Sequence, residues 1–83
     1  MKKLCVVGLG YVGLTFAIHA CKRGFSVHGL EVNKKTLSSI RKGKAHFYEP
    51  GIDELINKYL KRNFTVGHEA PRDEIYDYIY VHE

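Results

Sequence analysis

The residues best suited to chemistry are three glycines with the spacing G-x-G-x-x-G, namely Gly8, Gly10 and Gly13. They follow a short apolar run and precede an amphipathic stretch, the order expected of a strand, a tight turn and a helix. In such a turn the first glycine lets the backbone reverse, the second leaves room for a phosphate, and the third lets the helix pack on the strand. The N–H groups that open the helix, those of Tyr11, Val12 and Gly13, then point at the anion. The pattern predicts a phosphate-binding turn.

An acidic residue further along the chain supports this interpretation. Glu31 ends the second predicted strand, roughly twenty residues after the turn, where dinucleotide-binding proteins have an acid that accepts hydrogen bonds from a ribose. The alternative is a glycine-rich turn that binds nothing. The strand before the turn, the helix after it and the acid at Glu31 together favour a binding turn.

Hydrophobic periodicity indicates the elements that must position these residues. Strands are expected at residues 4–7, 27–31, 64–66 and 78–81. Helices are expected from the glycine turn to just before Gly24, from Asn33 to near Gly43 and from Ile52 to Arg62, with a short helical turn from Pro71 to about Tyr76. Strands that alternate with helices predict an α/β fold.

Helical crossovers are right-handed, so the strands should be parallel and stack in the order 3-2-1-4, as a Rossmann-like half fold. Residues 1–83 then form one truncated domain, with the ligand crevice beyond the carboxyl ends of strands 1 and 4. The fourth strand would be an apolar, unprotected edge. That edge predicts either a piece of a larger enzyme or a chain that pairs with a second copy of itself.

Composition narrows the choice of partners. The 83 residues carry a formal net charge of +4, which suits an anionic dinucleotide and also weak, nonspecific binding to nucleic acid. No RNA- or DNA-binding motif supports the second alternative. No stretch is long enough to cross a bilayer and none has the pattern of a signal peptide, so a cytoplasmic chain with no membrane partner is predicted.

The cysteines and histidines are expected to be structural or solvated. Cys5 and Cys21 fall in the first strand and the first helix, where they should be small buried hydrophobes rather than a disulfide in a reducing cytosol. His19 lies on the polar stripe of the first helix. His28 is expected to pack within a strand, since no other histidine lies at a metal-ligand spacing from it. The sequence predicts no metal site.

Five segments together resemble the N-terminal part of the nucleotide-sugar 6-dehydrogenases, the UDP-glucose and UDP-N-acetylmannosamine dehydrogenases. In chain order they are VVGLGYVGL, GLEVN, GKAHFYEPGIDELI, FTV and DYIYV. The combination of GLGYVGL with YEPG is far more specific than the glycines alone. Enzymes of this family oxidise the C6 hydroxyl of a UDP-sugar to a carboxylate in two NAD-dependent steps.

The resemblance implies a set of cofactor-binding residues. Gly8, Gly10, Tyr11, Val12 and Gly13 would surround the pyrophosphate of NAD. Glu31 would replace the family's usual aspartate and accept hydrogen bonds from the adenosine ribose, which favours NAD over NADP. A basic residue often helps to hold this end of the cofactor where the chain has Thr36, and Lys35 or Lys34 would take its place.

Other features depart from the family pattern. Gly67 and His68 stand where a threonine and an aspartate commonly follow the third strand, and His82 with Glu83 replaces small apolar residues after the fourth. Charge at Glu83 would weaken binding of a pyrophosphate. The catalytic cysteine, its lysine and aspartate partners, the dimerisation helix and the UDP-binding domain would all lie beyond the last residue. No catalytic residue is assigned here, and a UDP-sugar would bind only to a complete enzyme.

Three hypotheses follow from these observations. The chain is the NAD-binding N-terminal segment of a UDP-sugar 6-dehydrogenase, a stand-alone module without catalysis that binds a nucleotide or self-associates through its fourth strand, or a nonfunctional remnant that folds poorly. The YEPG loop at residues 48–51 has no derived chemical role and is interpreted as structural.

Overall fold

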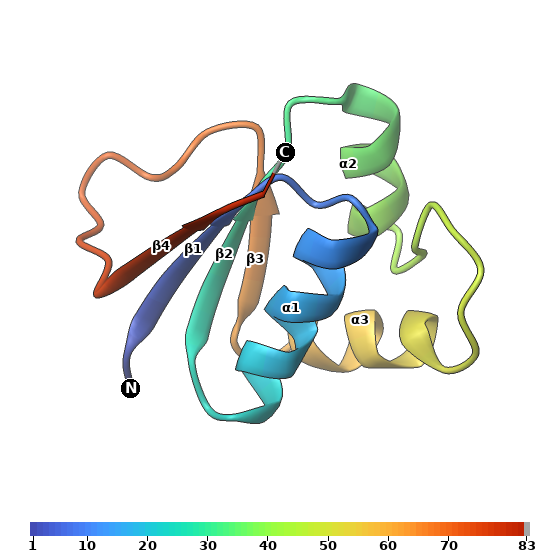
Figure 1. The fold of residues 1–83 in the computed structure, drawn as a ribbon, viewed down its shortest axis with the longest axis horizontal. Coiled ribbons are helices and arrows are strands. Elements are labelled where there is room, and N and C mark those ends of the chain that lie inside the picture. The colour runs from blue at the N-terminus through green and yellow to red at the C-terminus, as the bar shows by residue number, and fades with distance from the viewer. Residues whose placement is uncertain (83) are drawn as a thin grey trace.

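The computed structural model describes residues 1–82, and within them four strands and three helices alternate along the chain (Figure 1). The strands are β1 (Lys3–Val7), β2 (Ser26–Leu30), β3 (Phe64–Gly67) and β4 (Tyr78–Val81). The helices are α1 (Tyr11–Lys22), α2 (Lys34–Arg41) and α3 (Ile52–Leu60). All the strand pairs are parallel and the sheet order is β3-β2-β1-β4, which confirms the predicted topology.

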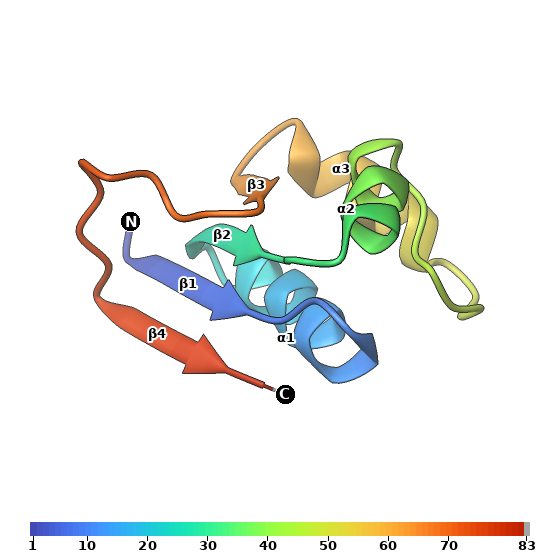
Figure 2. The ribbon, with the colours of Figure 1, turned by 90° about the horizontal axis from the view of Figure 1, so that it is seen from above.

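The sheet has a helical face and a face without helices. Figure 2 shows α1, α2 and α3 on one side of the sheet and the connection from β3 to β4, residues 68–77, on the other. The crossovers from β1 to β2 and from β2 to β3 move outward in the same direction, so their right-handedness places both on one face. The direction reverses between β3 and β4, and the connection therefore crosses the opposite face.

The hydrophobic core lies between the sheet and the helical face. Its fully buried side chains come from the strands, the glycine turn and all three helices: Val6, Leu9, Leu14, Ala17, Ile40 and Ile56. Phe64 of β3, 1 % exposed, closes the core at the outer strand. Leu55 and Leu60 of α3 are only partly buried, while Ile52, Ile56 and Tyr59 of the same helix are buried, in line with the predicted amphipathic face.

Residues at the helix ends form the caps that the sequence predicts. Gly24 has φ +93°, and the N–H of Phe25 donates to the carbonyl of Ala20 at 3.1 Å, so α1 closes with a glycine in the left-handed conformation. The Asn33 side chain accepts a hydrogen bond from the N–H of Thr36 at 3.0 Å and caps α2.

The helical turn predicted from Pro71 to about Tyr76 is wrong in its extent. One hydrogen-bonded turn covers Arg72 and Asp73, with the N–H of Glu74 3.4 Å from the carbonyl of Pro71, and residues 74–76 have no regular structure. The connection must cross from one edge of the sheet to the other, about three strand spacings of ~4.8 Å, and return by the length of a strand. Six helical residues advance only about 9 Å, whereas the same residues extended reach about 20 Å, so the required span favours extended chain.

The buried cysteines and His28 have the structural positions that we expected. Cys5 and Cys21 are buried free thiols. His28 is 7 % exposed, with Nε2 3.0 Å from the Glu69 carbonyl oxygen and Nδ1 2.8 Å from the Thr65 hydroxyl. Because a carbonyl only accepts, Nε2 donates to Glu69, while the Thr65 hydroxyl can donate or accept at Nδ1. His28 therefore fastens the β3–β4 connection to the sheet.

Across the described part of the chain, no helix has the length and apolar character needed to traverse a lipid bilayer.

Candidate functional site

Two of the three motif glycines are required by the fold itself. Gly8 has φ +95°, and a Cβ there would overlap the carbonyl oxygen of His82. A Cβ on Gly13 would overlap the carbonyl oxygen of Gly8, because the first turn of α1 packs directly on the end of β1. The N–H of Gly8 donates to the carbonyl of Leu30 at 2.8 Å and so is already occupied. Side chains at these positions would disrupt the turn before any ligand arrived.

Gly10 differs from its two neighbours in the motif. Its φ is −68°, which any residue adopts, and within residues 1–82 no atom beyond its chain neighbours lies within 4 Å of a Cβ placed there. The fold therefore gives no reason for glycine at this position. The space beside Gly10 faces outward at the start of α1.

The N-terminus of α1 is free to bind an anion. Gly10 is its N-cap, and its carbonyl accepts the first helical hydrogen bond, from Leu14, at 2.9 Å. In the described chain no side chain caps this end, and the first turn of α1 has no acidic residue. The N–H groups of the first turn, those of Tyr11, Val12 and Gly13, have no partner within the helix. The helix dipole adds to their attraction for negative charge.

Glu31 lies beside the turn and binds to it directly. Oε1 accepts a hydrogen bond from the N–H of Leu9 at 2.8 Å, and Oε2 accepts one from Asn33 at 2.9 Å. Each carboxylate oxygen has a further lone pair that a ribose hydroxyl could use. The sequence placed Glu31 near the ribose but did not reveal its hydrogen bond to Leu9, because a contact between residues so far apart leaves no local pattern.

Leu9, the residue between the first two motif glycines, anchors the turn in the core. Its side chain is fully buried, and a Cβ on Gly29 would lie 2.8 Å from Leu9 Cδ1. Gly29 thus leaves in β2 the space that Leu9 fills. This pair was not predicted from the sequence, although a glycine in the middle of a strand often marks a close approach and could have revealed it.

Lys34 and Lys35 begin α2 shortly after Glu31 in the chain but have different surroundings. Lys35 is exposed in the first turn of α2, and its role toward the cofactor remains a prediction. A groove of about 640 Å³ is lined by residues of α2, by Val32 before it and by His68 after β3: Val32, Lys34, Leu37, Ser38, Arg41 and His68. Lys34 therefore lines this groove, whereas Lys35 does not.

A second loop reaches the same end of α1. The Tyr11 hydroxyl donates a hydrogen bond to Glu49 Oε1 at 2.7 Å, and the Tyr11 ring meets the Phe47 ring edge-on with centroids 4.9 Å apart. This hydrogen bond, followed by the negative charge of Glu49, raises the pKa of the Tyr11 phenol. The GLGYVGL and YEPG motifs are therefore in contact, although 38 positions separate these two residues.

The thiols do not supply a nucleophile. Burial raises the pKa of the Cys21 thiol to about 12 and raises that of Cys5 above its ordinary value. A thiol needs to be ionised to attack, so neither is reactive near neutral pH. Within residues 1–82, no three or more histidine, cysteine or acidic side chains lie together as metal ligands would. The expected effect of Glu83 on a pyrophosphate lies outside the described residues.

Comparison with known proteins agrees with this geometry. Residues 2–80 match the model of the UDP-glucose/GDP-mannose dehydrogenase family, NAD binding domain. The chain belongs to this family. The match covers nearly all of residues 1–83, so these residues correspond to the family's NAD-binding domain or a part of it.

Relatives in the dehydrogenase family are much longer. The UDP-N-acetyl-D-mannosamine dehydrogenase of Campylobacter jejuni is 35 % identical over 71 residues, which are 86 % of this chain and 17 % of that protein. Its counterpart from Methanococcus maripaludis strain S2 is 41 % identical over 71 residues, 84 % of this chain and 17 % of the relative. The chain thus spans about a sixth of the length of these relatives.

Solved structures of the family share the fold. The UDP-N-acetyl-mannosamine dehydrogenase of Staphylococcus aureus superposes with a TM-score of 0.87 and 32 % identity over 98 % of this chain and 19 % of that one. The corresponding enzyme of Pyrococcus horikoshii gives a TM-score of 0.88 and 27 % identity over 96 % of this chain and 19 % of that one. The parallel sheet and its crossovers are therefore those of a dehydrogenase Rossmann domain.

Proposed function

We propose that this chain binds NAD at the carboxyl edge of its sheet and forms the cofactor-binding segment of a UDP-sugar 6-dehydrogenase. The observation that carries the proposal is the open position of Gly10. The fold requires glycine at Gly8 and Gly13 but not at Gly10, so the missing side chain there is best explained by a ligand that approaches the backbone.

The proposed cofactor contacts follow from the site geometry. The pyrophosphate would lie against Gly10 and accept hydrogen bonds from the first-turn N–H groups of α1. Glu31 would accept hydrogen bonds from the adenosine ribose, and its charge would oppose a 2′-phosphate, which favours NAD over NADP. Lys34 and Lys35 would supply positive charge on the ribose side. NAD carries the hydride chemistry, and this chain would orient the cofactor and exclude water from one side of it.

Substrate oxidation would need parts that relatives have beyond the matched residues. A UDP-sugar and the groups that hold it would come from a complete enzyme, in the same or in a second polypeptide. We place the function in the cytoplasm, since the two buried thiols need no oxidising compartment.

Gly10→Asp tests the proposal, because it should weaken NAD binding without lowering the stability of the fold. Aspartate is a favoured N-cap, so Gly10→Asp should keep the fold or stabilise it slightly. The same carboxylate would occupy the pyrophosphate position and repel the anion. Isothermal titration with NAD should therefore show at least about a tenfold loss of affinity while the thermal midpoint does not fall.

Two further variants complete this experiment. Lys61→Gln makes the same change in net charge at an exposed site after α3 and should bind NAD like the wild type. Glu31→Ala should also weaken binding. Unchanged NAD affinity in folded Gly10→Asp, or no saturable binding by the wild type at millimolar NAD, would contradict the proposal.

A second candidate function is self-association through β4. Its side chains Tyr78, Ile79 and Val81 are 50 %, 66 % and 62 % exposed, and no charged side chain interrupts the strand. Such an edge offers a template for another strand, either from a second copy or from the remainder of a dehydrogenase.

A further inference from the structure

The loop between α2 and α3 is held at several points although it has no regular secondary structure. At its start, the N–H of Ala45 donates to Asp53 Oδ1 at 2.9 Å. At its end, the carbonyl of Glu49 accepts from the N–H of Ile52 at 3.2 Å, and Gly51 takes φ +84° to enter α3. Figure 1 shows this segment, coloured yellow-green, projecting beyond the helices at the right. A loop fastened at both ends can transmit a constraint to what it touches in the middle.

The middle of the loop touches the residue that opens α1. Tyr11 contributes its backbone N–H to the anion-binding turn, while its hydroxyl donates to Glu49 at 2.7 Å and its ring packs against Phe47. The N-terminus of α1 has no side-chain cap among residues 1–82. The Thr15 hydroxyl lies 2.9 Å from the carbonyl of Tyr11 and 3.0 Å from that of Val12, and it restrains this turn only from within the helix. Helix ends tend to fray. The contact with Glu49 ties the first turn of α1 to a segment outside the helix.

We propose that Glu49 is a positioning residue of the dinucleotide site, which holds the first turn of α1 through its hydrogen bond to the Tyr11 hydroxyl. This inference rests on the proposed function, since the positioned N–H groups are those assigned to the pyrophosphate. A site ordered before the ligand arrives binds more tightly, because less conformational entropy is lost on binding. By reciprocity, a bound dinucleotide must order the loop of Phe47, Tyr48 and Glu49.

Charge and hydrogen bonding at Glu49 can be separated. A carboxylate near a site for an anion is unfavourable electrostatically, so the useful property of Glu49 is its ability to accept a hydrogen bond. Glutamine keeps a carbonyl oxygen that can accept from Tyr11 and removes the charge. Glu49→Gln should therefore bind NAD at least as well as the wild type, whereas Glu49→Ala should bind more weakly.

The test is a double-mutant cycle read by isothermal titration of the full chain with NAD. Tyr11→Phe and Glu49→Ala should each lower affinity about three- to tenfold, the effect expected when one hydrogen bond is lost. The double variant should be no weaker than either single one, because both remove the same interaction. Tyr78→Phe, which removes an exposed hydroxyl on β4, is the matched control and should bind like the wild type.

Hydrogen exchange supplies a second readout that a merely structural contact would not change. Amides of residues 46–49 should exchange more slowly when NAD is bound to the wild type, and this protection should be lost in Tyr11→Phe. If the wild type binds NAD but Tyr11→Phe changes neither the affinity nor the protection, the role of Glu49 is contradicted while the proposed function stands. Additive losses in the double variant would also overturn it. Absence of NAD binding by the wild type would overturn the proposed function and this inference with it.

Discussion

At the scale of single residues, the thiols Cys5 and Cys21 lie inside the fold rather than at the site. Cys21 is 3 % exposed and burial holds the pKa of its thiol at about 12, above the ordinary value of 9.0. Cys5 is likewise buried, and desolvation raises its pKa. Both side chains therefore behave as small hydrophobic residues in the packing of β1 and α1.

We expect this burial to be visible in thiol chemistry. At pH 8 neither cysteine of the folded chain should react with a disulfide reagent such as DTNB, and both should react at once in denaturant. The raised pKa of Cys21 also makes the free energy of unfolding depend on pH, because the unfolded thiol ionises near pH 9 while the folded one stays protonated. The contribution of Cys21 is thus complete below pH 9 and is lost as pH rises toward 12. Rapid labelling of the native chain would contradict the buried placement.

The residues of the turn show how far a motif can be interpreted without a structure. The spacing of the three glycines was sufficient to predict the turn between β1 and α1, while phosphate binding by the N–H groups that open the helix stays a prediction. It could not separate Gly10, which the fold leaves free, from Gly13, where any side chain would overlap Gly8. That distinction depends on how closely α1 packs on β1, a distance that no sequence pattern contains.

At the scale of elements, the strands and the three main helices were predictable because each has a strong local signal. Alternation, apolar runs and glycine or asparagine at the ends mark them. The prediction for the segment from Pro71 to Tyr76 was wrong in extent because the conformation of this segment is set by the distance that it must span. The contacts Glu31–Leu9 and Tyr11–Glu49 were also unpredictable, since each joins groups from segments far apart in the chain.

One asparagine joins two of these elements away from the site. Asn63, just before β3, donates from Nδ2 to the carbonyl of Cys21 at 3.1 Å and to that of Phe25 at 2.8 Å. It thereby ties the turn after α1 to the turn after α3, at the amino ends of the strands. Both acceptors belong to the backbone, so the loss of the side chain leaves two carbonyls without this donor.

We predict that Asn63→Ala lowers the free energy of unfolding by about 2–3 kcal/mol, because two hydrogen bonds are lost at partly buried carbonyls. Asn63→Asp should cost more, since a carboxylate cannot donate and would lie against two carbonyl oxygens. Urea titration followed by circular dichroism measures both, and a cooperative transition in the wild type also argues against a poorly folded remnant. Equal stability of the Asp and Asn forms would contradict the assigned hydrogen bonds.

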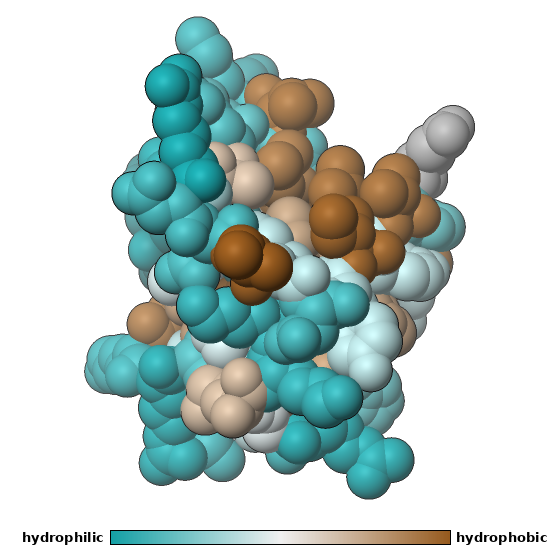
Figure 3. Space-filling model, turned by 90° about the vertical axis from the view of Figure 1, so that its left-hand side faces the viewer, coloured by the Kyte–Doolittle hydropathy of each residue, from teal (hydrophilic) through white to brown (hydrophobic). Residues whose placement is uncertain are grey.

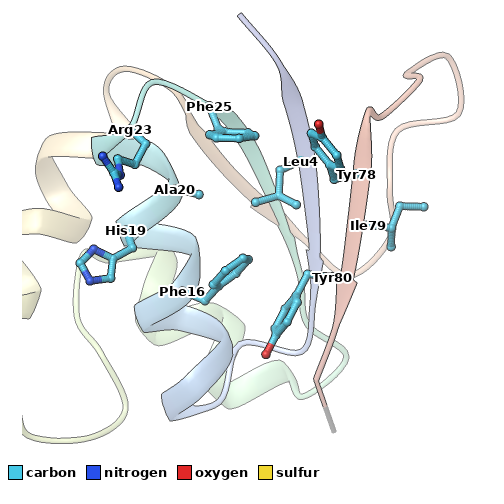
Figure 4. A pocket seen from close by; sticks show the side chains of 9 residues that line it. All are labelled: Leu4, Phe16, His19, Ala20, Arg23, Phe25, Tyr78, Ile79 and Tyr80. Carbon is cyan, nitrogen blue, oxygen red and sulfur yellow. The ribbon is translucent and has the colours of Figure 1, made fainter.

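At the scale of the whole molecule, β4 and the residues just before it expose apolar side chains: Ile75, Ile79 and Val81 are among the exposed large hydrophobic residues. On the side of the molecule drawn in Figure 3, brown apolar side chains gather toward the upper right. On the helical face a groove of about 510 Å³ lies between α1 and β4. Figure 4 shows the rings of Phe16 and Tyr80 facing each other across it, 4.3 Å apart.

An exposed apolar strand predicts concentration-dependent association. Sedimentation velocity over about a hundredfold range of concentration should show a shift from monomer toward dimer. Ile79→Lys should abolish the shift without unfolding the chain, because the side chain is 66 % exposed and a charge on an edge strand opposes pairing. Lys61→Gln, far from this edge, serves as the control. A single monomer mass at every concentration would exclude self-pairing through β4.

The long return from β3 also orders the events of folding. Lys3 donates its N–H to Asp77 Oδ2 at 2.8 Å across 74 positions of sequence, so pairing of β1 with β4 closes almost the entire chain into a ring. Closure of so large a ring costs more entropy than the nearer pairings of β1 with β2 and of β2 with β3. During synthesis the edge of β1 that pairs with β4 therefore stays unpaired until residues 78–81 have emerged. Strand β4 is therefore the last to dock, and a ligand bound at the carboxyl ends of β1 and β4 would select the molecules in which docking has already occurred.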